Sequence, residues 1–170
     1  MVSVASSYAS TGTGVEIYIS NGIIYFGVVG NSTNYNLITG NFPYSPTGVW
    51  VHVAAMLSSN VLYGFVNGVL QGSSSVITSI LGSNGVSIGG AFGTANTYLN
   101  GLISNIRIVN GTAVYSTSGF TPPNSHLTAV TGTQLLTLQN SLITDTSNNV
   151  LTITNNGTVT TNYTNVPFTS

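Results

Sequence analysis

Short apolar runs joined by Asn-Gly pairs constrain the fold of this chain more than any other feature. Val15, Ile17 and Ile19 alternate with less apolar residues, which places three apolar side chains on one face of a strand. Asn21-Gly22 follows, and this pair is the strongest short hairpin signal because both residues tolerate a positive φ. Asn-Gly pairs recur at 67–68, 84–85, 100–101, 110–111 and 156–157. Further strands are predicted over residues 23–29, 50–56, 61–66, 69–70, 86–88, 102–109, 134–138 and 150–154.

Helices are expected to be absent or limited to one short turn. No window of about 11 residues or more shows a 3.6-residue apolar period. Glu and Arg, which favour helices, occur once each, and Lys does not occur. The segment 116–126 contains Pro122-Pro123 and is predicted to be a loop, because proline interrupts a strand ladder. The fold class expected is therefore all-β, an antiparallel β-sandwich or barrel with few or no helices.

Charge is nearly absent from the chain, and this excludes several classes of partner. Glu16, Asp145 and Arg107 are the only formally charged side chains, so the net charge is −1. One Arg cannot neutralise a series of phosphates, which argues against nucleic acid and against anionic membrane surfaces as partners. The absence of cysteine excludes a disulfide framework and a thiolate metal site.

The low charge also favours association. Proteins that stay dispersed usually carry a net charge well away from zero, because self-repulsion opposes aggregation. We therefore expect this chain to sit in an assembly, with copies of itself or other virion or assembly proteins as partners. The alternative is that hydroxyl and amide side chains alone keep a monomer soluble.

Targeting signals are not recognisable in the sequence. No apolar stretch approaches the 18 or so residues of a membrane span, so membrane insertion is not expected. The first residues lack the basic and apolar regions of a secretory signal. The Ser-, Thr- and Asn-rich composition is nevertheless typical of a surface exposed outside cells. A virion component, or a fragment of a longer exported chain, reconciles these features, and we expect location on a virion or extracellular surface.

Several sequence blocks, taken in order, resemble the laminin-G-like, concanavalin A-like jelly roll. They are GVWVHVA at 48–54, YGFVNG at 63–68, VSIGG at 86–90, LNGLISNIRIVNGTAVY at 99–115, FTPP at 120–123 and GTQLL at 132–136. The resemblance covers roughly residues 15–140 and implies a lectin-like sandwich of the kind found in phage structural proteins and adhesins. On this basis residues 1–154 are expected to form the jelly roll, and residues 155–170 a C-terminal strand or an inter-subunit strap.

Two departures from the family pattern bear on function. Relatives usually have one or two strands before the segment that begins at Val15, so a first strand is expected to be missing and supplied by the tail or by another chain. Calcium sites in such modules use carboxylate ligands, and Asp145 is the only Asp. No metal site and no cofactor are therefore expected.

Catalysis is not expected either. Hydrolysis of a glycosidic bond normally needs two carboxylates about 5–10 Å apart, and glucanases of this fold carry clustered acidic residues. Glu16 and Asp145 lie far apart in sequence, with no acidic neighbour. His52 and His126 could formally join Asp145 and a Ser in a triad, but no Gly-x-Ser-x-Gly turn is present. A glycoside hydrolase is the least favoured of the functions considered.

Three residues are predicted to be structural. Trp50 and His52 lie on one face of a predicted apolar strand, as a core tryptophan and a core histidine bonded to backbone. Arg107 alternates with Ile106 and Ile108, so its head points away from their face, and a carboxylate or backbone carbonyl is its expected partner. Sugar stacking by Trp50 and a ligand contact by Arg107 are the alternatives.

Three tyrosines are the candidates for glycan binding. Tyr35, Tyr44 and Tyr98 lie near Asn- and Gly-rich turns, where a ring could stack on a sugar and amides could bind its hydroxyls. The competing interpretation is that they cover the edge of the core or a subunit contact. The functions predicted are therefore a non-enzymatic structural subunit of a virion (capsid decoration, tail or fibre) or other extracellular assembly, and alternatively a carbohydrate-binding or adhesion module that recognises surface glycans.

Overall fold

The computed structural model describes residues 2–5, 14–20, 22–29, 35–40, 49–75, 85–90 and 98–168. Within these ranges the chain contains antiparallel strands and no helix, which confirms the all-β fold class. The chain divides into two compact units. Unit 1 comprises Met1–Asn100 and Tyr115–Pro122, and unit 2 comprises Gly101–Val114 and Pro123–Ser170.

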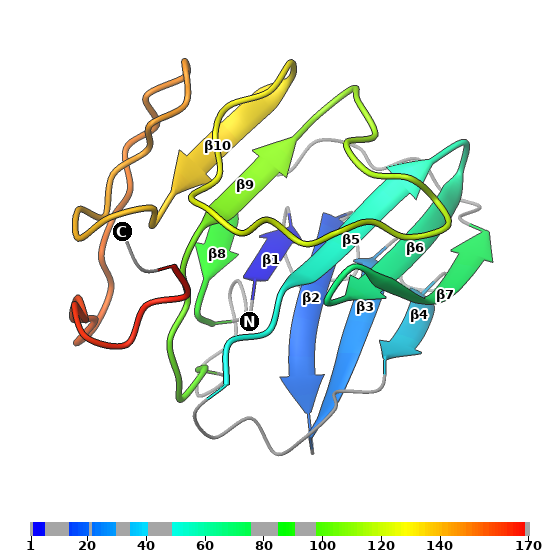
Figure 1. Ribbon diagram of the computed structural model, residues 1–170, viewed down its shortest axis with the longest axis horizontal. Helices are drawn as coiled ribbons and strands as arrows, with labels where there is room; N and C mark the ends of the chain where they lie inside the picture. Colours follow the sequence, from blue (N-terminus) through cyan, green and yellow to red (C-terminus); the bar gives the residue numbers. More distant parts are fainter. Residues whose placement is uncertain are drawn as a thin grey trace. The chain divides into compact units, whose positions relative to one another are not determined.

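Unit 1 is a two-layer sandwich. One sheet has the order β4-β3-β2-β1-β8, and the other has the order β5-β6-β7. In Figure 1 the β5-β6-β7 sheet lies in front of β2, β3 and β4, and β7 contacts β4 at the edge of the sandwich. The strands are β1 (Val2–Ala5), β2 (Gly14–Ser20), β3 (Ile23–Val29), β4 (Tyr35–Gly40), β5 (Val53–Ser58), β6 (Val61–Val66), β7 (Val69–Ser75) and β8 (Val86–Ile88).

The core of unit 1 lies between these two sheets. Its buried residues come from β3, β4 and β6: Ile24, Phe26, Val28, Ile38, Leu62 and Val66. Phe26 packs directly on the backbone of β6 at Gly64, where a Cβ would lie only 2.5 Å from the ring carbon Cδ2. Gly64 is therefore needed to let the two sheets approach each other over the largest core side chain.

Two-residue turns fix the register of three hairpins. Ser20 pairs with Ile23 around Asn21-Gly22, and Val66 pairs with Val69 around Asn67-Gly68, which confirms both predicted hairpins. Asn67 and Gly68 both have positive φ, as the predicted turn requires. A third tight turn, 59–60 between β5 and β6, also has positive φ at both residues but lacks glycine. This turn was not predicted, because Ser-Asn is a weak hairpin signal.

Three expected strands differ in the structure. The strand predicted from Trp50 begins at Val53, because its partner strand ends at Val66 and the backbone N–H of Asn67 donates instead to the carbonyl of His52. The strand predicted over 102–109 begins at Ile106, after Asn105 with φ +55°. The strand predicted over 150–154 is absent, because a turn holds Val150 at φ +48°, outside the extended region.

Two strands were not predicted. β1 is only four residues long and lies between β2 and β8, so the chain itself supplies a strand ahead of β2. β4 pairs with β3 along its whole length and so owes its conformation to its neighbour more than to its sequence. The presence of β1 corrects the expectation that the sandwich lacks a strand ahead of the segment that begins at Val15.

Unit 2 is built on a two-stranded sheet. β9 (Ile106–Val109) and β10 (Thr133–Thr137) pair antiparallel, with a bulge at Gln134. The segment 116–126, predicted as a loop, contains no strand. The described part of the tail, 155–168, contains bends and no strand, so the proposed strap remains a prediction.

Candidate functional site

Two of the three predicted glycan-binding tyrosines, Tyr35 and Tyr98, lie at opposite edges of one sheet. Tyr35 is the first residue of β4 and pairs with Val29 of β3. Tyr98 bridges to Gly90, directly after β8, and its side chain is 76% exposed. β4 and β8 are opposite edges of a five-stranded sheet, about 19 Å apart at the usual strand spacing. Tyr44 lies outside the described residues.

A pair of tyrosines that the sequence analysis did not select lies on the hairpin β2–β3. Tyr18 and Tyr25 are cross-strand partners, and their rings stack with centroids 4.7 Å apart and planes 10° apart. The pairing of these two tyrosines could have been predicted from the Asn-Gly turn. A two-residue turn pairs Ser20 with Ile23, and the same register pairs Tyr18 with Tyr25. One face of each ring is already covered by the other ring. The pair is therefore better explained as stabilising the hairpin than as a surface on which a sugar stacks.

The two carboxylates belong to different units, and each is buried. Glu16 lies on β2 in unit 1 and is 1% exposed, whereas Asp145 lies in unit 2. The Asp145 carboxylate accepts four hydrogen bonds. Oδ1 accepts from the backbone N–H of Leu136 (3.0 Å) and of Ser147 (2.9 Å), and Oδ2 accepts from the Ser147 hydroxyl (2.8 Å) and the Leu151 N–H (2.8 Å).

These donors set the charge state of Asp145. Burial raises the pKa of the carboxyl, but the backbone donors and the Ser147 hydroxyl together lower that pKa below its ordinary value. A carboxylate held in this way is ionised at neutral pH and has no proton to give to a leaving group. Its chemistry suits a structural anion and not a general acid.

Asp145 and the residues after it cover the free edge of β10. The Thr146 N–H donates to the Leu136 carbonyl (2.7 Å), beside the Asp145 bond to the Leu136 N–H. The Ser147 hydroxyl (3.2 Å) and the Asn149 side-chain amide (2.9 Å) donate to the Gln134 carbonyl. The segment 145–149, which we call the edge cap, therefore takes the place of a neighbouring strand.

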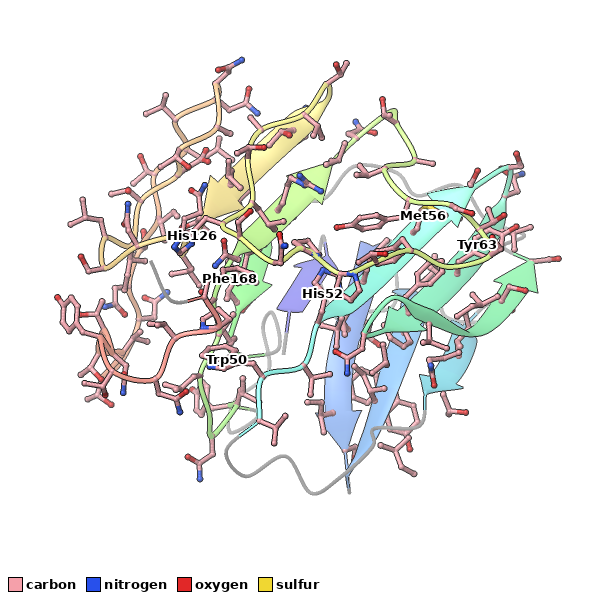
Figure 2. The ribbon with its side chains drawn as sticks, in the orientation of Figure 1. Trp50, His52, Met56, Tyr63, His126 and Phe168 are labelled. Atoms are coloured by element: carbon pink, nitrogen blue, oxygen red, sulfur yellow. The ribbon has the colours of Figure 1, made fainter. Side chains whose placement is uncertain are left out.

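Trp50 and His52 lie outside the core between the two sheets. Their side chains are half-buried, and the ring of His52 packs edge-on against Phe120 (5.5 Å) and Tyr115 (6.2 Å). The His52 backbone N–H donates to Oδ1 of Asn67 (2.9 Å). Figure 2 labels His52, together with Met56 and Tyr63 on β5 and β6. His52 thus belongs to a second apolar layer on the outer face of β5-β6-β7.

The loop 115–122 seals this outer layer. Phe120 stacks on Tyr115 (3.7 Å) and packs edge-on against Phe65 (5.2 Å), and its N–H donates to the Gly68 carbonyl (3.0 Å). Phe65 and Met56 are buried although they alternate with the core-facing residues of their strands. The sequence predicted the loop from its prolines but not its role as a cover, for which the aromatic pair Tyr115 and Phe120 was the available signal.

Arg107 has the kind of partner that was predicted. Its Nη1 donates to the backbone carbonyl of Thr128 at 2.9 Å. Just before this strand, the side-chain carbonyl of Asn105 accepts from the Leu127 N–H (2.9 Å), and its amide nitrogen lies 3.3 Å from Nδ1 of His126. The His126 ring in turn packs edge-on against Phe168, with centroids 5.5 Å apart. Both residues are labelled in Figure 2. These contacts attach residues 126–128 to the start of β9, and they attach the end of the tail to His126.

Unit 2 also exposes many large apolar side chains. They are Leu102, Val130, Leu142, Val150, Leu151, Val159, Tyr163 and Val166. No charged residue follows Asp145 in the sequence. The tail therefore presents apolar side chains among neutral Ser, Thr and Asn groups.

Neither a metal centre nor a membrane-spanning helix is evident in the described ranges. There, no three His, Asp or Glu side chains lie close enough together to hold an ion. Within the same ranges, no helix is long and apolar enough to cross a bilayer.

Comparison with known proteins gives one match. A laminin G family model, described as the concanavalin A-like lectin/glucanases superfamily, matches residues 2–117. This range contains β1 to β9 and most of unit 1. Neither a curated protein nor a solved structure matches the chain significantly.

Proposed function

Because the chain belongs to the laminin G family of the concanavalin A-like lectin/glucanases superfamily, we propose that it is a non-enzymatic structural module of a virion or other extracellular assembly. In this proposal the module associates with copies of itself. The sandwich of unit 1 provides a stable frame, and unit 2 provides the contact surface. The burial of Glu16 and the four hydrogen bonds to Asp145 support a role without catalysis.

The exposed apolar side chains of unit 2 carry this proposal. Contiguous exposed apolar patches on soluble proteins mark interaction sites, and in this proposal the exposed side chains of unit 2 form such a patch. Five of those in unit 2 fall within residues 150–166, where the sequence has no charge. A net charge of −1 also gives copies of the chain almost no mutual repulsion.

Light scattering on the full chain tests the proposal. We expect a native mass that is a multiple of 17.5 kDa at micromolar concentration and that falls on dilution. Since the contact contains neutral and apolar groups, we expect the mass to stay constant or rise between 0.05 and 1 M NaCl. A mass of 17.5 kDa at every concentration and salt would contradict the proposal.

A carbohydrate-binding or adhesion role is the second candidate, and the exposure of Tyr98 favours it. A ring that is 76% exposed beside the edge strand β8 is free to stack on a sugar. This role predicts binding of the chain to a surface glycan in an array, lost in Tyr98→Ala. Tyr163→Ala is the matched control, because Tyr163 is similarly exposed but lies in unit 2. Absence of binding to every glycan, or equal loss in both variants, would argue against this role.

A further inference from the structure

The two stacked tyrosines of the β2–β3 hairpin are positioned to react with each other. Tyr18 and Tyr25 are direct cross-strand partners, and their ring centroids lie 4.7 Å apart with planes inclined by 10°. Side chains placed in this way start from Cβ atoms only about 5 Å apart. The Asn21-Gly22 turn fixes this register, since it pairs Ser20 with Ile23. The backbone therefore holds the two phenol rings together, and the contact does not depend on the rings alone.

Both rings lie on the face of their sheet that points away from the core of unit 1. On β3, Ile24 and Phe26 are buried in that core, and Tyr25 lies between them in the sequence. On β2, Ile17 packs against the same core, and Tyr18 is the next residue. Both tyrosine side chains are half-buried. Part of each residue is therefore open to solvent, and an oxidant reaches the pair without opening the sandwich.

We propose that Tyr18 and Tyr25 are an oxidative cross-linking site, at which a haem peroxidase with hydrogen peroxide joins the two rings as dityrosine. Each phenol loses one electron and one proton, and the two radicals couple through the Cε ring carbons beside their hydroxyls. The hydrogens on those two carbons then move to the phenol oxygens. One hydrogen peroxide takes up the two electrons and two protons and leaves as two waters. Because the radicals form on neighbouring rings, their coupling is intramolecular and needs no second chain.

The rest of the chain offers this reaction little competition. The sequence contains no cysteine, so no thiol of the chain reduces a tyrosyl radical. Tyr63 stacks on Phe65 and Tyr115 stacks on Phe120, and phenylalanine has no hydroxyl from which a phenoxyl radical could form. A covalent bond between β2 and β3 restricts the unfolded chain, as a disulfide does in other domains. The cross-link lies within unit 1, so the inference goes beyond the proposed function and holds whether or not copies of the chain associate.

Peroxidase and limiting hydrogen peroxide, added to the full chain at low concentration, test the proposal. We expect monomers that have lost two hydrogens, that show the blue fluorescence of dityrosine, and whose β2 and β3 peptides stay joined after proteolysis between them. Raising the protein concentration about tenfold should increase covalent dimers through the exposed Tyr98 and Tyr163, but leave the cross-linked fraction of the monomers unchanged. Monomers without dityrosine, under conditions that couple free tyrosine, would overturn the proposal.

Conservative variants separate this pair from the other tyrosines. Tyr18→Phe and Tyr25→Phe keep the stacked rings but remove one phenol, and each should lower the dityrosine of the monomer at least about tenfold. Tyr163→Phe is the matched control, because it removes an exposed phenol of unit 2 and should leave the monomer signal unchanged. An undiminished signal in Tyr18→Phe or Tyr25→Phe, or an equal loss in Tyr163→Phe, would overturn the assignment.

The thermal midpoint tests whether the cross-link stabilises the hairpin. We expect the cross-linked monomer to unfold about 3–6 °C above the untreated chain. Peroxide-treated Tyr25→Phe should show no rise, because it cannot form the bond. A cross-linked wild-type monomer with an unchanged or lower midpoint would overturn the stabilising role of the bond.

Discussion

Unit 1 and unit 2 are made from the same nearly uncharged, Ser-, Thr- and Asn-rich sequence, yet they are stabilised in different ways. Unit 1 buries aliphatic and aromatic side chains between two sheets and adds a second apolar layer beneath the loop 115–122. Unit 2 has a single two-stranded sheet, and its buried residues include Thr137, Asp145 and Ser147 beside two leucines. A sheet can thus be completed by a second apolar layer, as in unit 1, or by a polar segment held by one buried carboxylate, as in unit 2.

The largest expected effect is in the core of unit 1. Phe26→Ala removes a fully buried ring that packs on Gly64, and we expect unit 1 to lose about 3–5 kcal/mol of unfolding free energy. Ile23→Ala on the same strand is the control, because Ile23 is half-exposed, and its cost should be about 1 kcal/mol. Urea unfolding measures both values. Similar losses in the two variants would show that the core is not where unit 1 gains its stability.

The second largest loss of stability is expected where the loop 115–122 covers the outer apolar layer. Gly68 and Gly22 both have φ +75°, but a Cβ on Gly68 would lie 1.9 Å from the Phe120 carbonyl oxygen, whereas nothing lies within 4 Å at Gly22. Gly68→Ala should therefore cost about 2–4 kcal/mol and open the loop 115–122 to protease, because that loop must move. Gly22→Ala should cost only about 1 kcal/mol, from its backbone conformation. Equal costs and an uncleaved loop in Gly68→Ala would show that the loop does not seal this face.

The edge cap of unit 2 should depend on the charge of Asp145. Asp145→Asn places an amide N–H₂ among four hydrogen-bond donors, and we expect a loss of about 2 kcal/mol at pH 7. Asn148→Ala, an exposed change inside the same segment, should cost less than about 0.5 kcal/mol. Denaturant unfolding followed by a probe in unit 2 compares the two variants.

The same residue predicts a pH dependence. The folded state lowers the pKa of Asp145 below its value in the unfolded chain, so the ionised carboxylate stabilises unit 2 above the unfolded pKa. This stability is lost as the pH falls from about 5 toward the folded-state pKa. The difference in unfolding free energy between wild type and Asp145→Asn should therefore shrink in that window. A constant difference from pH 7 to pH 3 would contradict this role.

The smallest expected effect has the opposite sign. Thr137 is 1% exposed and its hydroxyl has no hydrogen-bond partner. Thr137→Val keeps the shape and removes the unpaired hydroxyl, so we expect unit 2 to gain about 1 kcal/mol. Calorimetry should show a higher midpoint for the variant, and a lower one would mean that the hydroxyl is satisfied in solution.

Local chemistry explains which parts of the fold could be predicted from the sequence. Asn21-Gly22 and Asn67-Gly68 specify both their turn and the register of the strands beside them, and both hairpins were confirmed. The start of β5 could not be predicted in this way, because it depends on where the partner strand ends. The strand expected at 150–154 failed because hydrogen bonds to Asp145, donated from nine residues before it and six after it, hold the turn.

The candidate site was harder to predict, because exposure depends on tertiary packing. The apolar character of Val150 was visible in the sequence, but its left-handed backbone and its exposure were not. His52 was predicted in the core, yet it packs beneath a loop that lies more than sixty residues further along the chain. The match over residues 2–117 confirmed the family resemblance. The family identifies the fold of the chain but not its ligand.

Whether a second copy covers unit 2 can be measured by amide hydrogen exchange at two protein concentrations, because exchange reports on both units at once. We expect the amides of β3 and β6 to exchange slowly at either concentration, since unit 1 is complete within one chain. The amides of residues 150–166 should exchange rapidly in dilute protein and at least tenfold more slowly at the concentration where the chain associates. Equal exchange of residues 150–166 at both concentrations would contradict the claim that unit 2 is covered by a second copy.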